Sequence, residues 1–331
     1  MNTVGTLFKV SIFGESHGKL VGVLLDGVPS GIKLSEEDFI SDIERRKPNK
    51  KGTTPRKESD IPHIESGVFN GYTTGGAILI TFFNENINDN DYSNLVTQPR
   101  PGHADYTGYV KYSGFNDYRG GGSFSGRLTL GIVAAGVVAK KILPFKFDSR
   151  IKSIKGETDS TKFLDVVENA MKNKDSVGGT IEIRVSNMTK GLGEPYFDSV
   201  ESRVSQMLYS IGAVKGVSFG VGFDGETLTG SLFNDSIIDE NGLTKTNNNG
   251  GINGGITNGN DLIVNVFVKP TPSISVPQET FNFKTGKVET LVIKGRHDAC
   301  IALRAPVVLE AAVSIALCDL FLINRAYKKE K

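Results

Sequence analysis

The stretch RLTLGIVAAGVVAKK, residues 127–141, contains the longest apolar run of the sequence. Its central residues, Leu128–Ala139, carry no charge, and cations stand on both sides of them. A segment of this length is too short to cross a bilayer. A second stretch, PVVLEAAVSIALCDLFLIN at 306–324, is apolar on nearly every side as well. Helices of this kind belong inside a protein, so both are predicted to be buried core helices.

Strand patterns alternate with the helical ones. GAILITF (76–82), GTIEIRV (179–185) and DLIVNVFV (261–268) alternate in polarity or are rich in β-branched residues. TGGAILITF and VGGTIEIRV also share the form x-G-G-x-I-x-I, which hints at a duplicated unit. Sheets on the outside with helices between them would bury both apolar helices. We therefore predict an α+β fold, with a doubly wound parallel sheet as the alternative.

The bulk composition is that of an ordinary soluble protein. Of 331 residues, 38% are apolar and 23% charged, and the net charge of +1 gives no overall basic field that would attract nucleic acid. The two cysteines, Cys300 and Cys318, suit a reducing cytosol better than a disulfide framework or a zinc site. No signal-peptide pattern begins the chain, and no linker divides it. We expect one cytoplasmic domain, 1–331, with no nucleic-acid or membrane partner.

Two segments have the chemistry of anion sites. ERRKPNKKGTTPRKE, 44–58, holds seven cations and two acids, which fits a solvated loop, a nucleic-acid contact or a site for a small polyanion. In RGGGSFSGRLTL, 119–130, three glycines precede a helix start, where the backbone can approach an anion closely. The Gly-Lys-Ser/Thr ending of a P-loop is missing, and a plain loop-to-helix junction is the alternative. By composition alone, TNNNGGINGGITNGN at 246–260 is a floppy surface loop.

Three of the four histidines lie in short segments rich in glycine and charge. They occur in FGESHG (13–18), RPGHADYTGYVKY (100–112) and GRHDAC (295–300), each with a carboxylate close by in sequence. No pair has the spacing that zinc ligands need. Separate histidines on glycine-rich loops favour acid–base groups that converge on one pocket, although an isolated histidine is usually a satisfied surface or core residue.

Taken together, these segments resemble the chorismate synthase family. The motifs that carry the resemblance, in order, are GESHG, DGVPSGI (26–32), RPGHAD, YRGGG with SGR, GLGEP (191–195), GGINGGITNG, KPTPSI (269–274) and KGRHDAC. The resemblance implies a β-α-β sandwich in which antiparallel sheets enclose a central helical layer, internally duplicated, in a homotetramer. It also implies conversion of 5-enolpyruvylshikimate 3-phosphate to chorismate in the shikimate pathway. That lyase reaction is a 1,4-anti elimination of phosphate that needs reduced FMN without net redox change.

The resemblance also implies roles for individual residues. His17 would protonate the leaving phosphate with help from Ser16 and Ser125, His103 would sit at the N1/O2 edge of the flavin, and Asp298 would assist proton movement at N5. Arg46, Arg100 and Arg127 would bind the anionic substrate. The FMN-binding positions would be Ser123, Phe124, Ser125, Gly212, Ala213, Gly254, Lys269, Pro270, Thr271, Pro272, Ser273 and Arg296.

The chain departs from the usual family pattern at a few of these positions. Ser123 and Phe124 stand where many relatives have Arg and Ser, Gly212 replaces a frequent Asn, and Lys50 and Lys51 stand where a second arginine is often found. A flavin reductase would be a rival interpretation, but the sequence has no G-x-G-x-x-G after a strand. The same absence and the compact motif spacing predict a monofunctional enzyme. Its flavin would be reduced by an external flavin reductase, with NADPH only an indirect source of reducing equivalents.

Overall fold

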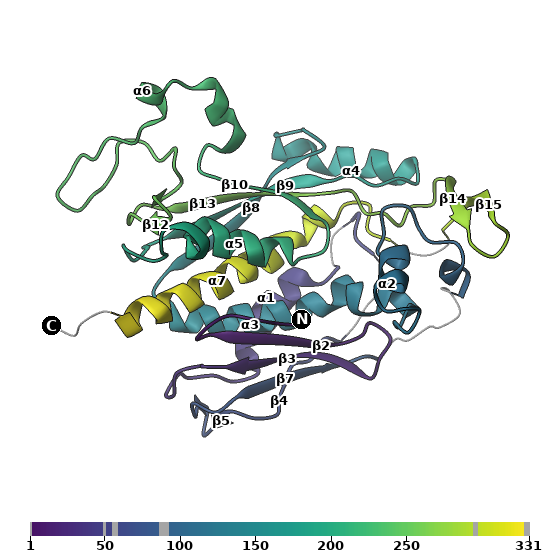
Figure 1. Cartoon of the computed structure of the whole chain (residues 1–331), viewed down its shortest axis with the longest axis horizontal. Helices are drawn as coiled ribbons and strands as arrows, with labels where there is room; N and C mark the ends of the chain where they lie inside the picture. Colours follow the sequence, from purple (N-terminus) through teal and green to yellow (C-terminus); the bar gives the residue numbers. More distant parts are fainter. Residues whose placement is uncertain (1, 49–50, 55–58, 86–92, 294–296, 328–331) are drawn as a thin grey trace.

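The structure, a computed structural model, describes residues 2–48, 51–54, 59–85, 93–293 and 297–327. Two antiparallel sheets enclose a layer of helices (Figure 1). The first has the strand order β1-β2-β3-β7-β4 and the second β10-β13-β9-β8. The strands are β1 (Thr3–Val4), β2 (Lys9–Gly14), β3 (Leu20–Asp26), β7 (Ile78–Phe83), β4 (His63–Ile64), β10 (Val214–Phe219), β13 (Leu262–Val268), β9 (Gly179–Ser186) and β8 (Lys146–Ile154). The predicted α+β sandwich is confirmed, and the parallel alternative is wrong.

The two apolar stretches form the helices α3 (Thr129–Ile142) and α7 (Ala305–Tyr327) at the centre of the sandwich. They pack on each other, α3 against the first sheet and α7 against the second. By length and composition α7 could also cross a membrane, but 78% of its most apolar window is buried inside the protein. Its apolarity therefore has the ordinary explanation of a core helix. Beside this pair lie α1 (Glu37–Arg46) and α5 (Val200–Tyr209).

The two halves of the chain share one topology, but the two segments of the form x-G-G-x-I-x-I do not occupy equivalent positions in it. In the first half two strands, β2 and β3, lead into α1, and a third strand, β7, leads on to α3. In the second half β8 and β9 lead into α5, and β13 leads on to α7, with the same neighbours in the sheet. The x-G-G-x-I-x-I segments lie on β7 and β9, which are not equivalent in this scheme. The sequence match therefore reflects a common way of starting a strand.

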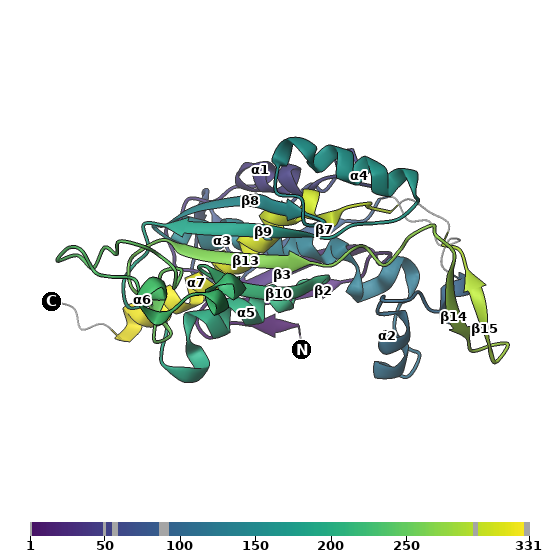
Figure 2. The same ribbon diagram turned by 90° about the horizontal axis from the view of Figure 1, so that it is seen from above.

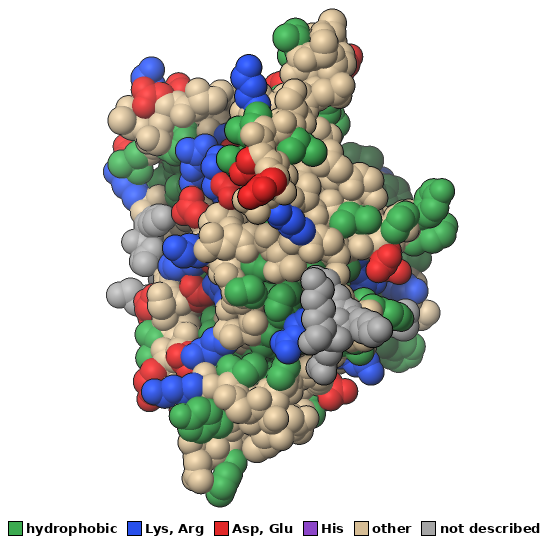
Figure 3. Space-filling model, turned by 90° about the vertical axis from the view of Figure 1, so that its left-hand side faces the viewer, with side chains coloured by type: hydrophobic (Ala, Val, Ile, Leu, Met, Phe, Trp, Pro, Cys, Tyr) green, Lys and Arg blue, Asp and Glu red, His purple; other side chains and the backbone are tan. Residues whose placement is uncertain are grey.

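Smaller elements extend the two ends of the sandwich (Figure 2). One end carries α2 (Asp105–Lys111) and the hairpin β14–β15 (Gln278–Asn282, Lys287–Leu291). The other carries the hairpin β11–β12 (Ile252–Asn253, Ile256–Thr257) and α6 (Gly230–Phe233). Seen from that second end, acidic and basic side chains are intermixed with apolar ones (Figure 3). The remaining elements are α4 (Phe163–Lys172) and the hairpin β5–β6 (Val68–Phe69, Tyr72–Thr73).

Candidate active site

The triple-glycine loop stands between two of the predicted catalytic histidines. Gly120, Gly121 and Gly122 all have positive φ, at 57°, 85° and 52°. A Cβ on Gly120 would lie 2.1 Å from Cε1 of His17, and a Cβ on Gly121 would lie 3.5 Å from Cε1 of His103. Both histidines therefore face the same short piece of backbone, and at Gly120 only glycine leaves room for the His17 ring.

His17 is held in the interior at the end of the first sheet. It follows β2, and the exposed fractions of Ser16 and His17 are 1% and 4%. The amide of Ser16 donates to the carbonyl oxygen of Gly122 at 3.2 Å, which ties this turn to the glycine loop. Glu15, the carboxylate beside the histidine in sequence, is exposed instead. Burial next to a glycine loop is a suitable setting for a group that transfers a proton to a bound ligand.

His103 belongs to a local ion-pair network. Its Nδ1 lies 2.6 Å from Oδ1 of Asp105, so Nδ1–H donates to the carboxylate. Arg100 grips the same carboxylate in a fork, with Nε and Nη2 each 2.8 Å from its oxygens, and Nη1 donates to Ser273 Oγ at 3.0 Å. The pKa of Asp105 is well below its usual range; burial opposes this shift, and the bonds from Arg100 and His103 outweigh it. Arg100 thus orients Asp105 and His103 in addition to lying near the site.

The other two predicted substrate arginines, Arg46 and Arg127, share a buried carboxylate, that of Asp60. Arg127 Nη1 lies 2.8 Å from Oδ1 of Asp60, and Arg46 Nη1 lies 3.5 Å from its Oδ2. All three side chains are buried, at 7%, 5% and 4% exposure. Arg46 also donates to Thr129 Oγ1 and to the carbonyl oxygen of Gly126, each at 2.9 Å, where α3 begins. Asp60 has a positive φ of 48°, and no motif in the sequence marks it.

This arginine cluster has more positive than negative charge. Asp298 accepts from Arg304 Nη2 at 2.6 Å and from the amide of Thr54 at 2.9 Å. Burial, followed by the charges of Arg304 and Arg127, lowers the pKa of Arg46 from 12.5 to about 9, although Asp60 and Asp298 oppose the shift. Arg46 therefore stays charged at neutral pH, and an anion bound next to it would stabilise its charged form.

The segment 269–273 closes the site from the second sheet. Lys269 Nζ donates to the carbonyl oxygen of Gly102 at 2.5 Å, and its amide donates to the carbonyl oxygen of Ala213 at 2.9 Å. Ala213 has an unusual φ of 76°. Two buried polar atoms of the site, Thr271 Oγ1 and His297 Nε2, have no hydrogen-bond partner among the described residues. Buried polar atoms are nearly always bonded, so these two fit a ligand or water that the site takes up.

Not every predicted residue lies in this cluster. Gly254 is in the β11–β12 hairpin. This hairpin bonds to Gly191, which in turn bonds to Asn324 near the C-terminal end of α7. Arg304, which belongs to the site, lies just before the N-terminal end of the same helix. Twenty helical residues separate these points by about 30 Å, so one chain does not bring Gly254 to the histidines. Arg296 lies outside the described residues. Ser123 and Phe124 are exposed, Phe124 by 43%, and Ser125 is half-buried with its Oγ accepting from the amide of Arg127.

Most of the described cations of the basic stretch 44–58 pair within the chain. Arg45 binds Glu310, Lys47 binds Glu44 and Lys51 binds Glu168, while Arg46 is buried. Lys50 lies outside the described residues. The interpretation as a nucleic-acid surface loses its support, because such a surface needs exposed and available cations. The interpretation as part of a polyanion site keeps its support at Arg46.

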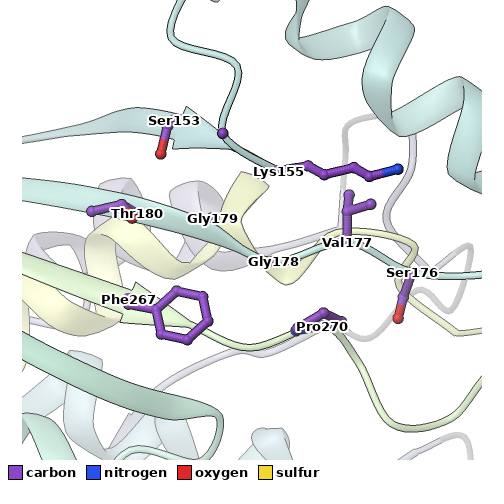
Figure 4. A pocket seen from close by; sticks show the side chains of 10 residues that line it. Ser153, Lys155, Ser176, Val177, Gly178, Gly179, Thr180, Phe267 and Pro270 are labelled. Atoms are coloured by element: carbon purple, nitrogen blue, oxygen red, sulfur yellow. The ribbon is translucent and has the colours of Figure 1, made fainter.

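A separate cavity of about 290 Å³ lies beside the site (Figure 4). Phe267 and Thr180, on β13 and β9, and Lys155 after β8 line it, with Pro270 at its edge. The neighbours of Phe267 in the strand, Val266 and Val268, point into the core, so this cavity is on the outer face of the second sheet. None of the histidines lines it, and it borders the segment 269–273 on the side away from the site.

Comparison with known proteins identifies the family to which this geometry belongs. A sequence model of chorismate synthase matches residues 8–322. The chain belongs to the chorismate synthase family. The chorismate synthase of Chitinophaga pinensis is 54% identical over 99% of this chain and 100% of its own, and that of Thermococcus gammatolerans is 41% identical over 98% of each. A solved structure described as chorismate synthase superposes with a TM-score of 0.75 at 27% identity, covering 97% of this chain and 93% of that one.

The predicted family, fold and enzyme class are therefore confirmed. As a chorismate synthase the chain is a lyase of the shikimate pathway, and 5-enolpyruvylshikimate 3-phosphate is the substrate that the family implies. The substrate carries two carboxylates and a phosphate, which agrees with a buried cluster of arginines whose positive charge is only partly balanced.

Proposed function

We propose that this chain eliminates phosphate from 5-enolpyruvylshikimate 3-phosphate with reduced FMN, at the site formed by the triple-glycine loop. The observation that carries the proposal is the position of His17 and His103 against consecutive glycines of that loop. One is buried beside Ser16, and the other is paired with a carboxylate. Two histidines in different settings at one piece of backbone are suited to different proton-transfer roles.

The residues present fit a flavin mononucleotide. The backbone of 120–122 allows a close approach, and Lys269 with the other residues of 269–273 offers a cation, hydroxyls and the unbonded Thr271 Oγ1. Ser123, Ser125, Gly212, Ala213 and Arg296 are the other proposed contacts. When bound, reduced FMN supplies electron density as phosphate departs and a nitrogen that takes up the proton from C6.

The remaining chemistry falls to this chain's own side chains. His17, with Ser16 and Ser125, delivers a proton to the departing phosphate, and Arg46 and Arg127 hold the substrate anions in surroundings short of negative charge. His103 is fixed by Asp105 so that its Nε2 side faces Gly121, where it would meet a bound flavin. Asp298, held by Arg304 and Thr54, would assist proton transfer to a bound flavin. Arg100 acts by orienting Asp105.

We also propose how the chain is organised around this site. One continuous core draws on both sheets, which supports a single domain over 1–331. Gly254, about 30 Å away within one chain, would contact the flavin of a neighbouring subunit in a homotetramer. The enzyme would be monofunctional and cytoplasmic, with an external flavin reductase and only indirect use of NADPH. Sedimentation equilibrium tests the tetramer, and anaerobic turnover with FMN and NADPH alone would contradict the external reductase.

The decisive experiment is phosphate release from 5-enolpyruvylshikimate 3-phosphate under anaerobic conditions, with and without reduced FMN. We expect chorismate and phosphate in equal amounts only when reduced FMN is present, and no consumption of FMN. Turnover without flavin would contradict the proposed cofactor. Absence of turnover in both cases, with the substrate still bound, would contradict the proposed chemistry.

A further inference from the structure

The short helix α2 has a glycine in its interior, and the structure shows what occupies the space. A Cβ on Gly108 would lie 2.7 Å from Cε2 of Phe124 and 3.3 Å from its Cζ. The aromatic ring thus packs directly on the helix backbone. Glycine is less favourable than alanine inside a helix, so its presence here fits the need for this close approach.

Helix α2 depends on such contacts for its position. It has seven residues, far fewer than a helix needs to be stable alone in water. On one side Phe124 packs against it, and the centroid of the Phe124 ring also lies 6.3 Å from that of Tyr112. Next to the β14–β15 hairpin, Tyr106 stacks on Phe283 with ring centroids 5.5 Å apart and nearly parallel planes. The helix is therefore held between two aromatic contacts.

The first residue of α2 is the carboxylate that orients the site. Asp105 receives Nδ1–H of His103 and the fork of Arg100, so a movement of α2 moves all three groups. Phe124 lies two residues after Gly122, and its contact with Gly108 places it at the junction between the triple-glycine loop and α2. Phe124 as a residue is 43% exposed, and its ring still packs on the helix.

We infer that Phe124 is a positioning residue: its ring, packed on Gly108, fixes α2 against the glycine loop and so sets the position of the Asp105–His103 pair. This role replaces the side-chain contact with FMN predicted for Phe124 from family resemblance. The inference deepens the proposed function, because it concerns the histidine assigned to the flavin edge. Its first test needs no flavin and no turnover, so the two can fail separately.

The test begins with the ligand-free protein. The ring resonances of His103 would be followed by NMR and assigned with His103→Gln, in wild type, Phe124→Ala, Phe124→Leu and Phe115→Ala. We expect Phe124→Ala to shift them and Phe124→Leu, which still fills the space, to leave them near wild type. Phe115 is 93% exposed at the far end of the same segment and is the matched control. Unchanged resonances in Phe124→Ala would overturn the inference.

A double-mutant cycle with Gly108→Ala provides the second test, read as the dissociation constant for oxidised FMN. Gly108→Ala alone should weaken binding by pushing the ring and the helix apart. The three heavy atoms nearest to the added methyl group all belong to the Phe124 ring. In the Phe124→Ala background they are gone, so the same change should have little further effect. If the two sites are independent, the fold-changes of the single variants should multiply to within about twofold of that of the double variant. A departure of threefold or more shows coupling. Multiplicative effects would show that Phe124 and Gly108 act independently and would overturn the inference. Equal losses of FMN affinity in Phe124→Leu and Phe124→Ala would show instead that the ring itself contacts the flavin.

Discussion

Two glycine-rich loops of this chain, 119–127 and 246–260, look alike in composition but serve different neighbours. In the first, the space beside Gly120 and Gly121 is filled by histidine rings. In the second, a Cβ on Gly250 would lie 2.3 Å from the amide nitrogen of Gly220, and one on Gly251 would lie 2.6 Å from the carbonyl oxygen of Asp261. Positive φ occurs in both loops. Glycine content alone therefore does not distinguish the two loops: the close neighbour of Gly120 is a histidine ring, whereas those of Gly250 and Gly251 are backbone atoms.

The second loop is also an ordered structure in its own right. Asp235 accepts hydrogen bonds from the amides of Asn248 and Asn249, and Asn247 bonds to Asp261 and Gly251. Such bonds within the loop and to its surroundings define its conformation. The interpretation as a floppy loop, favoured by composition, is therefore wrong.

The largest effect that follows from this comparison is at His17. We expect His17→Ala to lower kcat by about 10²–10⁴-fold, the usual contribution of a general acid, with little change in the dissociation constant for FMN. His63, which lies edge-on to Phe83 in the first sheet, is the control: His63→Ala should retain turnover. Turnover of His17→Ala within a few-fold of wild type would remove His17 from the mechanism.

A sharper form of the comparison substitutes one glycine in each loop. Gly120→Ala would displace His17 and should lower kcat by about 10²-fold, the cost of misplacing a catalytic group by an ångström. In Gly250→Ala the added Cβ would clash with backbone atoms, and the residue would keep a similarly unfavourable positive φ. This substitution should instead lower the free energy of unfolding by about 1–3 kcal/mol. Turnover measured below the unfolding transition separates the two. Equal losses of kcat in both variants would break the distinction between the loops.

The third comparison concerns Arg46, the proposed substrate ligand beside the first loop. We expect Arg46→Ala to raise the KM for substrate by about 10- to 150-fold, which corresponds to a lost charged hydrogen bond of about 1.5–3 kcal/mol, with a smaller change in FMN affinity. Arg45→Ala is the matched control, because the neighbouring arginine pairs with Glu310 away from the glycine loop. An unchanged KM with weakened FMN binding would show that Arg46 serves the other ligand.

What the sequence could predict depends on how far apart the interacting groups are along the chain. Both core helices follow from local apolarity, and the pairing of His103 with Asp105 lies within one turn. Asp60 could not be found, because its importance comes from Arg127, which lies 67 residues further along the chain. The family resemblance implies a flavin contact at Gly254, but the order of motifs along a chain carries no information about which end of a sandwich a motif occupies.

The smallest effect concerns pH and His297, the third histidine of the glycine-rich segments. Burial, then the charge of Arg100, lowers the pKa of His297 from 6.5, Asp298 opposes the shift, and His103 adds to it. The unfolded chain therefore binds a proton at this residue more readily than the folded one. Its contribution to stability is present above pH 6.5 and is lost as the pH falls through the folded pKa. Urea unfolding of wild type and His297→Gln between pH 7.5 and 5.5 tests this: wild type should lose more stability on acidification than the variant. Parallel losses would mean that His297 is as easily protonated in the folded protein as in the unfolded chain.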